Sequence, residues 1–206
     1  MTKDSLVAPA RPEISWTHPA ISRILNLLPV DARTLLDAGS GRGIIGALCR
    51  IYRGYSRLVG MDVYGPYLEF CRRHNLYDDL FEWNLEVLPL PFSTREFDVA
   101  TAVEVIEHLE KEKGIALLNE LERVARRVVV TTPNRFFAQA AYDGNDWQQH
   151  RSAWCAAELA SRGYHVIGGG GLLFFGRKIR GFSPVLEGPA RLVPRWAEYL
   201  LCVKCT

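Results

Sequence analysis

The chain has 206 residues, a length that fits one domain of ordinary size. Its hydrophobic content of 48% supports a buried core and excludes a disordered chain, and the net charge of +2 gives no sign of a nucleic-acid-binding protein. The charge is uneven, because residues 172–206 carry six basic and two acidic side chains.

The termini and the cysteines indicate the compartment. Residues 1–15 contain no apolar run of the kind that secretory signals have, and no stretch approaches the roughly 18 apolar residues of a membrane-spanning helix. Five cysteines, an odd number, fit a reducing environment. Cys202 and Cys205 form a CxxC pair, but no second pair exists to complete a zinc site. We therefore expect a cytoplasmic protein.

Strand and helix patterns alternate along the chain. Apolar runs typical of buried strands occur at residues 34–38, 57–62, 78–83, 97–103, 127–132, 164–168 and 198–204. Apolar positions at helical spacing occur at residues 18–28, 44–52, 66–74, 115–124 and 152–162. Ser152 and Gly163 suit the two ends of the last helix. The alternation predicts an α/β fold with a mainly parallel sheet that is covered on both faces.

No repeat or change in composition divides the chain. We therefore expect residues 1–206 to form a single domain. Residues 172–196 are rich in glycine and proline and predict an irregular insertion between the last two strands.

A glycine-rich loop follows the first predicted strand, in the stretch LLDAGSGRG at residues 35–43. Gly39, Gly41 and Gly43 allow a tight turn and a close approach of the backbone to a ligand. Their N–H groups and the start of the next helix form a partly positive concavity, which suits either a pyrophosphate or a carboxylate. In a sheet of this kind, the loop lies where ligands bind.

Two cofactors compete for this loop. Gly41, Gly43 and Gly46 spell GxGxxG, and Asp62 follows at the distance that a nicotinamide dinucleotide site requires. Asp37, however, would repel a pyrophosphate that lies across the strand tip. It can instead accept hydrogen bonds from the N–H groups of the loop and stabilise a neighbouring cation. S-adenosylmethionine (SAM) carries both an ammonium and a sulfonium, so the acid favours SAM.

The stretch LLDAGSGRG resembles the first motif of the class I SAM-dependent methyltransferases. Four later segments resemble further motifs of that family in the same order: GMDV at 60–63, WNLEVLPLPFSTREFDVA at 83–100, AVEVIEHL at 102–109 and VVVTTPN at 128–134. The resemblance covers residues 18–168 and is closest to the subgroup that includes the quinone-biosynthesis methyltransferases. It implies a doubly wound, Rossmann-like sheet of seven mainly parallel strands, the last of them antiparallel.

The resemblance also implies the residues that hold SAM and its product, S-adenosylhomocysteine. They are Asp37, Gly39, Ser40, Gly41, Asp62, Val63, Asn84, Leu85 and Val103. Asp62 would accept hydrogen bonds from both ribose hydroxyls, and Val63 and Leu85 would contact the adenine. Asn84 stands where the family usually has an acid, and its carbonyl oxygen can still accept a hydrogen bond from the adenine amino group.

The catalytic candidates are Glu104, His108, Asn134 and His150. Glu104 would line the region of the sulfonium with Val103. His108 suits a positioning role, a general base or a metal ligand. The ExxEH pattern that ends at His108, with the later His150, resembles the four-ligand magnesium site of small-RNA 2′-O-methyltransferases, which also carry TTPN and HxxxW. ExxEH is common in metal-free relatives too, so we predict no metal.

The acceptor side has fewer signals. Asn134 would point its amide towards the substrate, and a loop with Tyr142, Asp143, Trp147 and His150 would form a wall of the cleft. Basic and aromatic residues of the insertion suit a solvated face, an anionic acceptor or peripheral contact with a membrane surface. They are Phe174, Phe175, Arg177, Lys178, Arg180 and Phe182.

Methyl transfer is an in-line displacement that depends on alignment, so no fixed catalytic triad is required. We predict a SAM-dependent methyltransferase that acts on an O, N or C atom of a small-molecule or lipid-like acceptor. One alternative is a magnesium-dependent RNA 2′-O-methyltransferase, although the charge does not favour nucleic acid. Another is a SAM-binding module without catalysis, which would bind tightly and turn nothing over.

Overall fold

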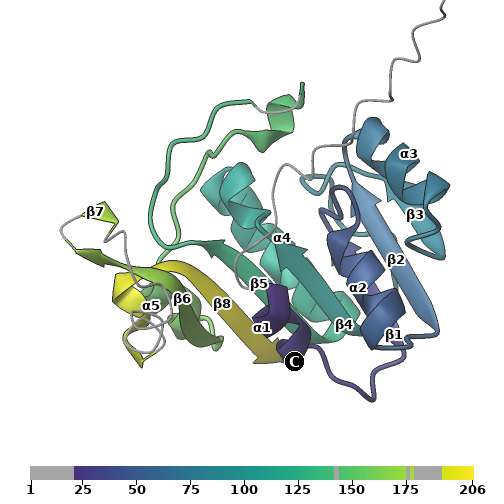
Figure 1. The fold of residues 1–206 in the computed structure, drawn as a ribbon, viewed down its shortest axis with the longest axis horizontal. Coiled ribbons are helices and arrows are strands. Elements are labelled where there is room, and N and C mark those ends of the chain that lie inside the picture. The colour runs from purple at the N-terminus through teal and green to yellow at the C-terminus, as the bar shows by residue number, and fades with distance from the viewer. Residues whose placement is uncertain (1–20, 142–143, 175–176, 179–191) are drawn as a thin grey trace, which may run out of the picture.

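One twisted sheet organises the molecule, and helices cover both of its faces (Figure 1). The structure, a computed structural model, describes residues 21–141, 144–174, 177–178 and 192–206. Five neighbouring strands run parallel, in the spatial order β3 (Asp79–Glu82), β2 (Arg57–Asp62), β1 (Thr34–Ala38), β4 (Phe97–Val103) and β5 (Ala125–Pro133). The strands β1, β2 and β4 are buried along most of their length, as parallel strands covered on both faces must be.

The far half of the sheet contains the antiparallel strand. β8 (Ala197–Cys205) lies between β5 and β6 (His165–Phe174) and is antiparallel to both. The predicted doubly wound sheet, with its last strand antiparallel, is thereby confirmed. A two-residue strand, β7 (Arg177–Lys178), extends the sheet beyond the seven predicted strands.

The segment predicted as an irregular insertion at residues 172–196 begins as regular structure. Its first residues continue β6, which turns back through β7. Gly169 and Gly170 allow this continuation, because a Cβ at Gly169 would lie 2.1 Å from the Tyr199 ring of β8. Gly170 has a φ of +72°, and the register of β6 against β8 shifts at this point.

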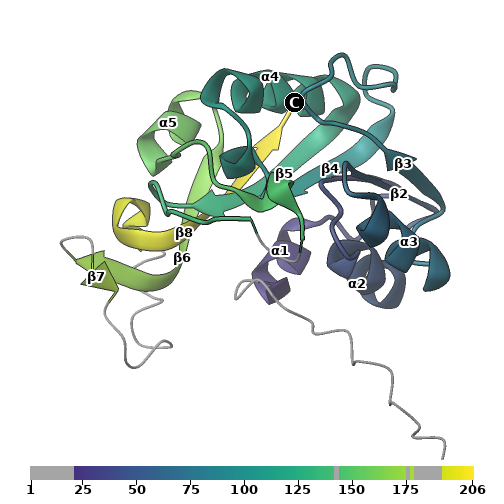
Figure 2. The same ribbon diagram turned by 90° about the horizontal axis from the view of Figure 1, so that it is seen from above.

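Two groups of helices cover the two faces of the sheet (Figure 2). One face carries α4 (Lys111–Val124) and α5 (Ala156–Ser161), and the other carries α1 (Ile21–Leu27), α2 (Ile44–Tyr52) and α3 (Gly65–Arg73). Three short 3₁₀ turns are η1 (Ile106–His108), η2 (Asp146–Gln148) and η3 (Pro194–Trp196). In the described part of the chain, no helix is long and apolar enough to cross a membrane.

The last helix differs from the prediction at its start. α5 begins at Ala156, so Ser152 does not cap it. The Ser152 hydroxyl donates instead to the carbonyl oxygen of Ile106, at 3.1 Å, because a tertiary partner is in reach. Gly163 follows the end of the helix with a φ of +86°, a conformation that suits glycine there.

Strand order places the crevice of the sheet between β1 and β4. The chain leaves β1 towards α2 on one face and leaves β4 towards α4 on the other, so the loops after these strands diverge. In open parallel sheets ligands bind at such a point, beyond the carboxyl ends of the strands. The glycine loop of residues 39–43 lies there.

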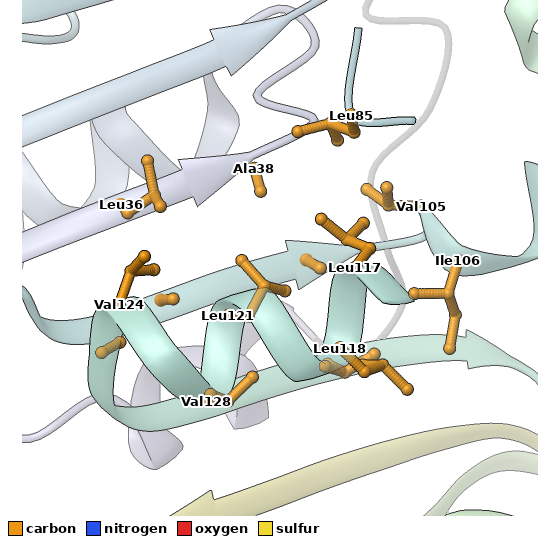
Figure 3. Packing of buried hydrophobic residues seen from close by; sticks show 14 of the residues in the cluster. Leu36, Ala38, Leu85, Val105, Ile106, Leu117, Leu118, Leu121, Val124 and Val128 are labelled. Atoms are coloured by element: carbon orange, nitrogen blue, oxygen red, sulfur yellow. The ribbon is translucent and has the colours of Figure 1, made fainter. Parts of the chain in front are cut away.

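Helix α4 anchors this arrangement through one apolar face. Leu117, Leu118, Leu121 and Val124 recur at helical spacing and are fully buried. Figure 3 shows them against the sheet, where the cluster includes residues of β1, β4 and β5. Close packing of this kind makes each side chain sensitive to truncation.

We expect Leu121→Ala to lower the free energy of unfolding by about 2–5 kcal/mol, because it removes buried contacts and leaves a cavity. Urea denaturation checks this value. Ile51→Ala is the matched control, since the Ile51 side chain is 70% exposed and its truncation should change stability by less than about 0.5 kcal/mol. Equal effects of the two changes would contradict the assignment of the core.

Candidate functional site

A cavity of about 1060 Å³ lies beyond the carboxyl ends of the central strands. All the predicted cofactor and catalytic residues line it, including His108, Asn134 and His150 from outside the glycine loop. Trp147 lines it as well. Tyr142, Asp143, Phe175, Arg180 and Phe182 lie outside the described residues, as do the side chains of Phe174, Arg177 and Lys178.

The glycine loop is fastened to the end of β2. The N–H groups of Gly39 and Ser40 both donate to the carbonyl oxygen of Met61, at 2.8 Å, and that of Gly41 donates to Oδ2 of Asp62, at 2.8 Å. Gly39 has a φ of +76°, and a Cβ there would lie 2.4 Å from Val105. Only glycine satisfies both conditions, so the backbone is fixed in close approach to the cavity.

Asp37 is buried beneath this loop, with its side chain tied to two hydroxyl groups. Tyr77 donates to it at 2.5 Å and Thr101 at 2.7 Å. The prediction that loop N–H groups donate to Asp37 is wrong, because β2 accepts from those groups. Burial raises the pKa of Asp37 to about 6, and the two hydroxyl bonds oppose the rise.

Asp62 links the loop to the start of α3. Its Oδ1 accepts from the N–H of Tyr64 at 2.9 Å, while Oδ2 accepts from Gly41. Burial raises the pKa of this carboxyl, and the backbone N–H groups oppose the rise. A carboxylate offers about four acceptor sites in all, so Asp62 keeps acceptor capacity for a ligand in the cavity.

Asn84 and Leu85 form the wall on the β3 side. Oδ1 of Asn84 accepts from the N–H of Glu86 at 2.9 Å, so it stabilises the local turn. The residue still lines the cavity with the buried Leu85. Its predicted contact with adenine stays a prediction.

Two threonines at the end of β5 donate hydrogen bonds to two acids from the segment that follows β4. Thr131 donates to Oε1 of Glu104 at 2.8 Å, and Thr132 donates to Oε2 of Glu107 at 3.0 Å. Glu104 has a φ of +54°, an uncommon conformation for a residue with a side chain. Burial, followed by the charge of Glu104, raises the pKa of Glu107 well above its usual value.

His108 and His150 stand beside these acids. Nδ1 of His108 lies 3.1 Å from the carbonyl oxygen of Gln149, and Nδ1 of His150 lies 2.6 Å from that of Phe137. A carbonyl only accepts, so Nδ1 carries a proton in each ring, and the neutral form of each ring has its lone pair on Nε2. Burial lowers the pKa of His108, which favours the neutral ring.

Three of these side chains converge. One ligand atom each from Glu107, His108 and His150 lies within 4.8 Å of the others. The rings of the two histidines lie 4.8 Å apart between centroids. The described residues thus bring together the ExxEH pattern and the distant His150.

Asn134 lines the cavity, but its side-chain amide does not have the predicted role. Its side-chain amide donates to the carbonyl oxygens of Pro194, at 3.0 Å, and Ala197, at 2.8 Å. The amide therefore ties β5 to the start of β8 and does not point towards an acceptor. Four hydroxyl groups that hold the acids of the site were not predicted from the sequence: those of Tyr77, Thr101, Thr131 and Thr132. The signal that could have indicated Thr131 and Thr132 is their place in the TTPN motif.

The comparisons with known proteins agree with this geometry. A family model described as a methyltransferase domain matches residues 36–128. Residues 36–128 therefore carry a methyltransferase domain, and the prediction of a SAM-dependent methyltransferase is confirmed. SAM is accordingly its cofactor.

Solved structures share the fold of the methyltransferase. The methyltransferase domain of a bacterial CtHen1 is 23% identical with a TM-score of 0.58, over 90% of this chain and 96% of that one. The small RNA methyltransferase HEN1 is 15% identical with a TM-score of 0.56, over 88% and 25%. Magnesium protoporphyrin IX methyltransferase from Synechocystis PCC 6803, with bound SAM, is 16% identical with a TM-score of 0.51, over 89% and 76%. No curated protein sequence matches the chain.

We expect Asp62→Ala to weaken SAM binding by roughly 10- to 100-fold, because hydrogen bonds from ribose hydroxyls to a charged acceptor are worth about 1.5–3 kcal/mol. Calorimetric titration with SAM measures the change. Asp98→Ala is the matched control: Asp98 also accepts backbone N–H groups, from Arg33 and Thr34, but outside the cavity. Unchanged affinity in Asp62→Ala would contradict the assignment.

We also expect the affinity for SAM to fall as the pH drops below about 6, the pKa of Asp37. Above that pH the carboxylate carries the negative charge that favours a cationic ligand, and below it the charge is lost. The affinity should then decrease by up to about tenfold per pH unit. In Asp37→Asn the affinity should be lower at pH 7.5 and should fall less steeply towards pH 5, because only the charge of Asp62 is left to titrate. A wild-type profile that is flat would refute the role of this charge.

Proposed function

We propose that this methyltransferase transfers the methyl group of SAM to a hydroxyl oxygen, with a divalent cation held at the acceptor side of the cavity. The observation that carries the proposal is the convergence of Glu107, His108 and His150 within 4.8 Å. Glu104 lies beside Glu107 and completes the acidic side of the group. The proposal departs from the prediction, made on the sequence pattern, that no metal is used.

The residues present fit a cation. Oε1 of Glu107 is buried and accepts no hydrogen bond within the described residues. The neighbouring Glu104 carboxyl adds a second negative group, and it raises the pKa of Glu107 further. A buried oxygen acceptor without a donor is costly, and a cation would remove that cost.

The histidines narrow the choice of metal. Both rings hold Nδ1 against a backbone carbonyl, which orients Nε2 and is the support that ligating histidines commonly have. Mg²⁺ prefers oxygen ligands, whereas a mixture of imidazole nitrogen and carboxylate oxygen suits first-row transition metals. We therefore expect Mn²⁺, Co²⁺ or Zn²⁺ to bind more tightly than Mg²⁺.

In this proposal the cofactor residues keep the roles that the family resemblance implies. Asp62 accepts from the ribose hydroxyls, Val63, Asn84 and Leu85 contact the adenine, and the backbone of the glycine loop lies under the methionine part. When bound, SAM supplies the methyl group, and the cation would lower the pKa of an acceptor hydroxyl. Glu104 and Val103, which both border the cavity, would lie between SAM and the cation.

The cavity supports a small acceptor. Pockets for drug-sized ligands measure about 300–1,000 Å³, so 1060 Å³ accommodates the cofactor and a small acceptor together. Phe136 and Phe137 line its outer part and are 58% and 68% exposed, which gives the acceptor an apolar wall. A hydroxylated small molecule with an apolar portion fits both features.

A ribose hydroxyl of RNA is the second candidate acceptor. One observation favours it: the chain shares its fold with the small RNA methyltransferase HEN1, and ExxEH, TTPN and HxxxW resemble the motifs of small-RNA 2′-O-methyltransferases. Exposed aromatic rings such as Phe137 can also stack on bases. Methylation assays that compare small RNA with monomeric hydroxyl compounds decide between the two acceptors.

We expect Glu107→Gln and His150→Ala each to weaken Mn²⁺ binding at least tenfold and to leave SAM affinity within about twofold, since removal of a ligand acts on the cation alone. Calorimetric titration with Mn²⁺ and with SAM measures both. His165→Ala is the matched control, because His165 is exposed on β6 and outside the group.

Activity gives the second readout. Chelation with EDTA should abolish methyl transfer to a hydroxyl acceptor, and Mn²⁺ should restore it. A wild-type protein that binds no divalent cation, or that keeps full activity in EDTA, would overturn the proposed role of the metal while leaving the SAM-dependent activity intact.

A further inference from the structure

His150 lies on a segment whose backbone is fastened to the turn η1, which carries Glu107 and His108. The N–H groups of Arg151 and Ser152 both donate to the carbonyl oxygen of Glu107, at 2.8 and 3.1 Å. In Figure 1 this segment is the returning part of the long loop that follows β5. The residue directly after His150 is thus held by the backbone of the acid that His150 faces.

The side chains of Ser152 and Trp154 add further hydrogen bonds to this attachment. The Ser152 hydroxyl donates to the carbonyl oxygen of Ile106 at 3.1 Å. Nε1 of Trp154 donates to the same carbonyl at 3.1 Å and to the Ser152 hydroxyl at 3.0 Å. Ser152 is 7% exposed and Trp154 is 1% exposed, so water does not compete with these bonds.

The Trp154 ring occupies a socket on α4. A Cβ at Gly114 would lie 2.7 Å from Cζ2 of the ring, so the helix can approach the ring only because residue 114 is glycine. On the ring face, Nζ of Lys111 lies 3.6 Å from the centroid and also pairs with Glu158. The socket leaves the indole little freedom to shift.

The backbone of Trp154 is tied to the end of β5. The N–H of Arg135 donates to its carbonyl oxygen at 2.7 Å, and Asn134 and Trp154 form an isolated parallel bridge. The segment after His150 is therefore attached to η1, α4 and β5 at once. These are the elements that carry or follow Glu107 and His108.

We infer that Ser152 and Trp154 are positioning residues that place His150 against Glu107 and His108, so that a cation binds at full affinity only while this attachment is intact. The inference rests on the proposed function. Its physical reason is that metal ligands must lie within a fraction of an ångström of their bonding positions, and His150 comes from a segment with little regular structure of its own.

The test compares metal affinity with cofactor affinity in variants that keep all three ligands. Ser152→Ala and Trp154→Phe remove the hydrogen bonds to Ile106 while retaining most of the packing. We expect each to weaken Mn²⁺ binding by 10-fold or more, the usual effect of losing a supporting contact around a metal, and to change SAM affinity less than twofold. Calorimetry with Mn²⁺ alone and with SAM alone gives both values.

Gly114→Ala tests the same inference from outside the segment. The added methyl group meets the Trp154 ring and should displace it, so Mn²⁺ affinity should fall while the hydrogen-bonding groups remain. Ser161→Ala and Trp196→Phe are the matched controls. The Ser161 hydroxyl donates to the carbonyl oxygen of Glu158 within α5 and is exposed, and the Trp196 side chain is 40% exposed.

The outcomes separate this inference from the proposed function. Wild-type Mn²⁺ affinity in Ser152→Ala and Trp154→Phe, with loss of binding in His150→Ala, would overturn the positioning role and leave the metal proposal standing. A parallel loss of SAM affinity would also overturn it, because the residues would then support the fold as a whole. Failure of the wild-type protein to bind Mn²⁺ would refute the proposed metal, and the inference with it.

Discussion

The hydrogen bonds that fasten the glycine loop to the end of β2 are the constraint on which the cofactor half of the site depends. Gly39 and Ser40 donate to Met61, and Gly41 donates to the carboxylate of Asp62. Because these N–H groups donate to β2, they are not available to donate to Asp37. Asp37 is left to accept from hydroxyl groups beneath the loop, and Asp62 becomes both a support of the loop and a wall of the cavity.

Buried acids mark both halves of the cavity, and their surroundings differ. Asp37 is satisfied by Tyr77 and Thr101, so its charge is retained near neutral pH although burial raises its pKa to about 6. Glu107 receives a single hydroxyl bond and faces a second acid, so burial and the charge of Glu104 both oppose its ionisation. The surroundings of Asp37 stabilise its charge without a ligand, whereas a cation would stabilise the charge of Glu107. This difference is the physical basis of the proposed function.

The buried strands and the glycine loop could be predicted because each depends on residues close together in the chain. Parallel strands covered on both faces must be largely apolar, and the sequence shows such runs at residues 34–38, 57–62 and 97–103. Ser152 and Asn134 could not be interpreted in the same way. Ser152 suits a helix cap locally, but a carbonyl group from the distant Ile106 accepts its hydroxyl hydrogen. Asn134 follows a proline as turn residues do, yet its amide is consumed by Pro194 and Ala197.

The sequence by itself determined the fold class, the family and the cofactor, because tight turns and close backbone approach demand glycine at fixed positions after a strand that ends in an acid. Only the tertiary structure decided that His150 meets Glu107 and His108. That meeting depends on hydrogen bonds from Arg151, Ser152 and Trp154 to the backbone of η1, far away in the chain. Residue types and spacing do not encode such long-range backbone contacts, because any carbonyl group can accept and only the folded chain fixes which one lies within reach.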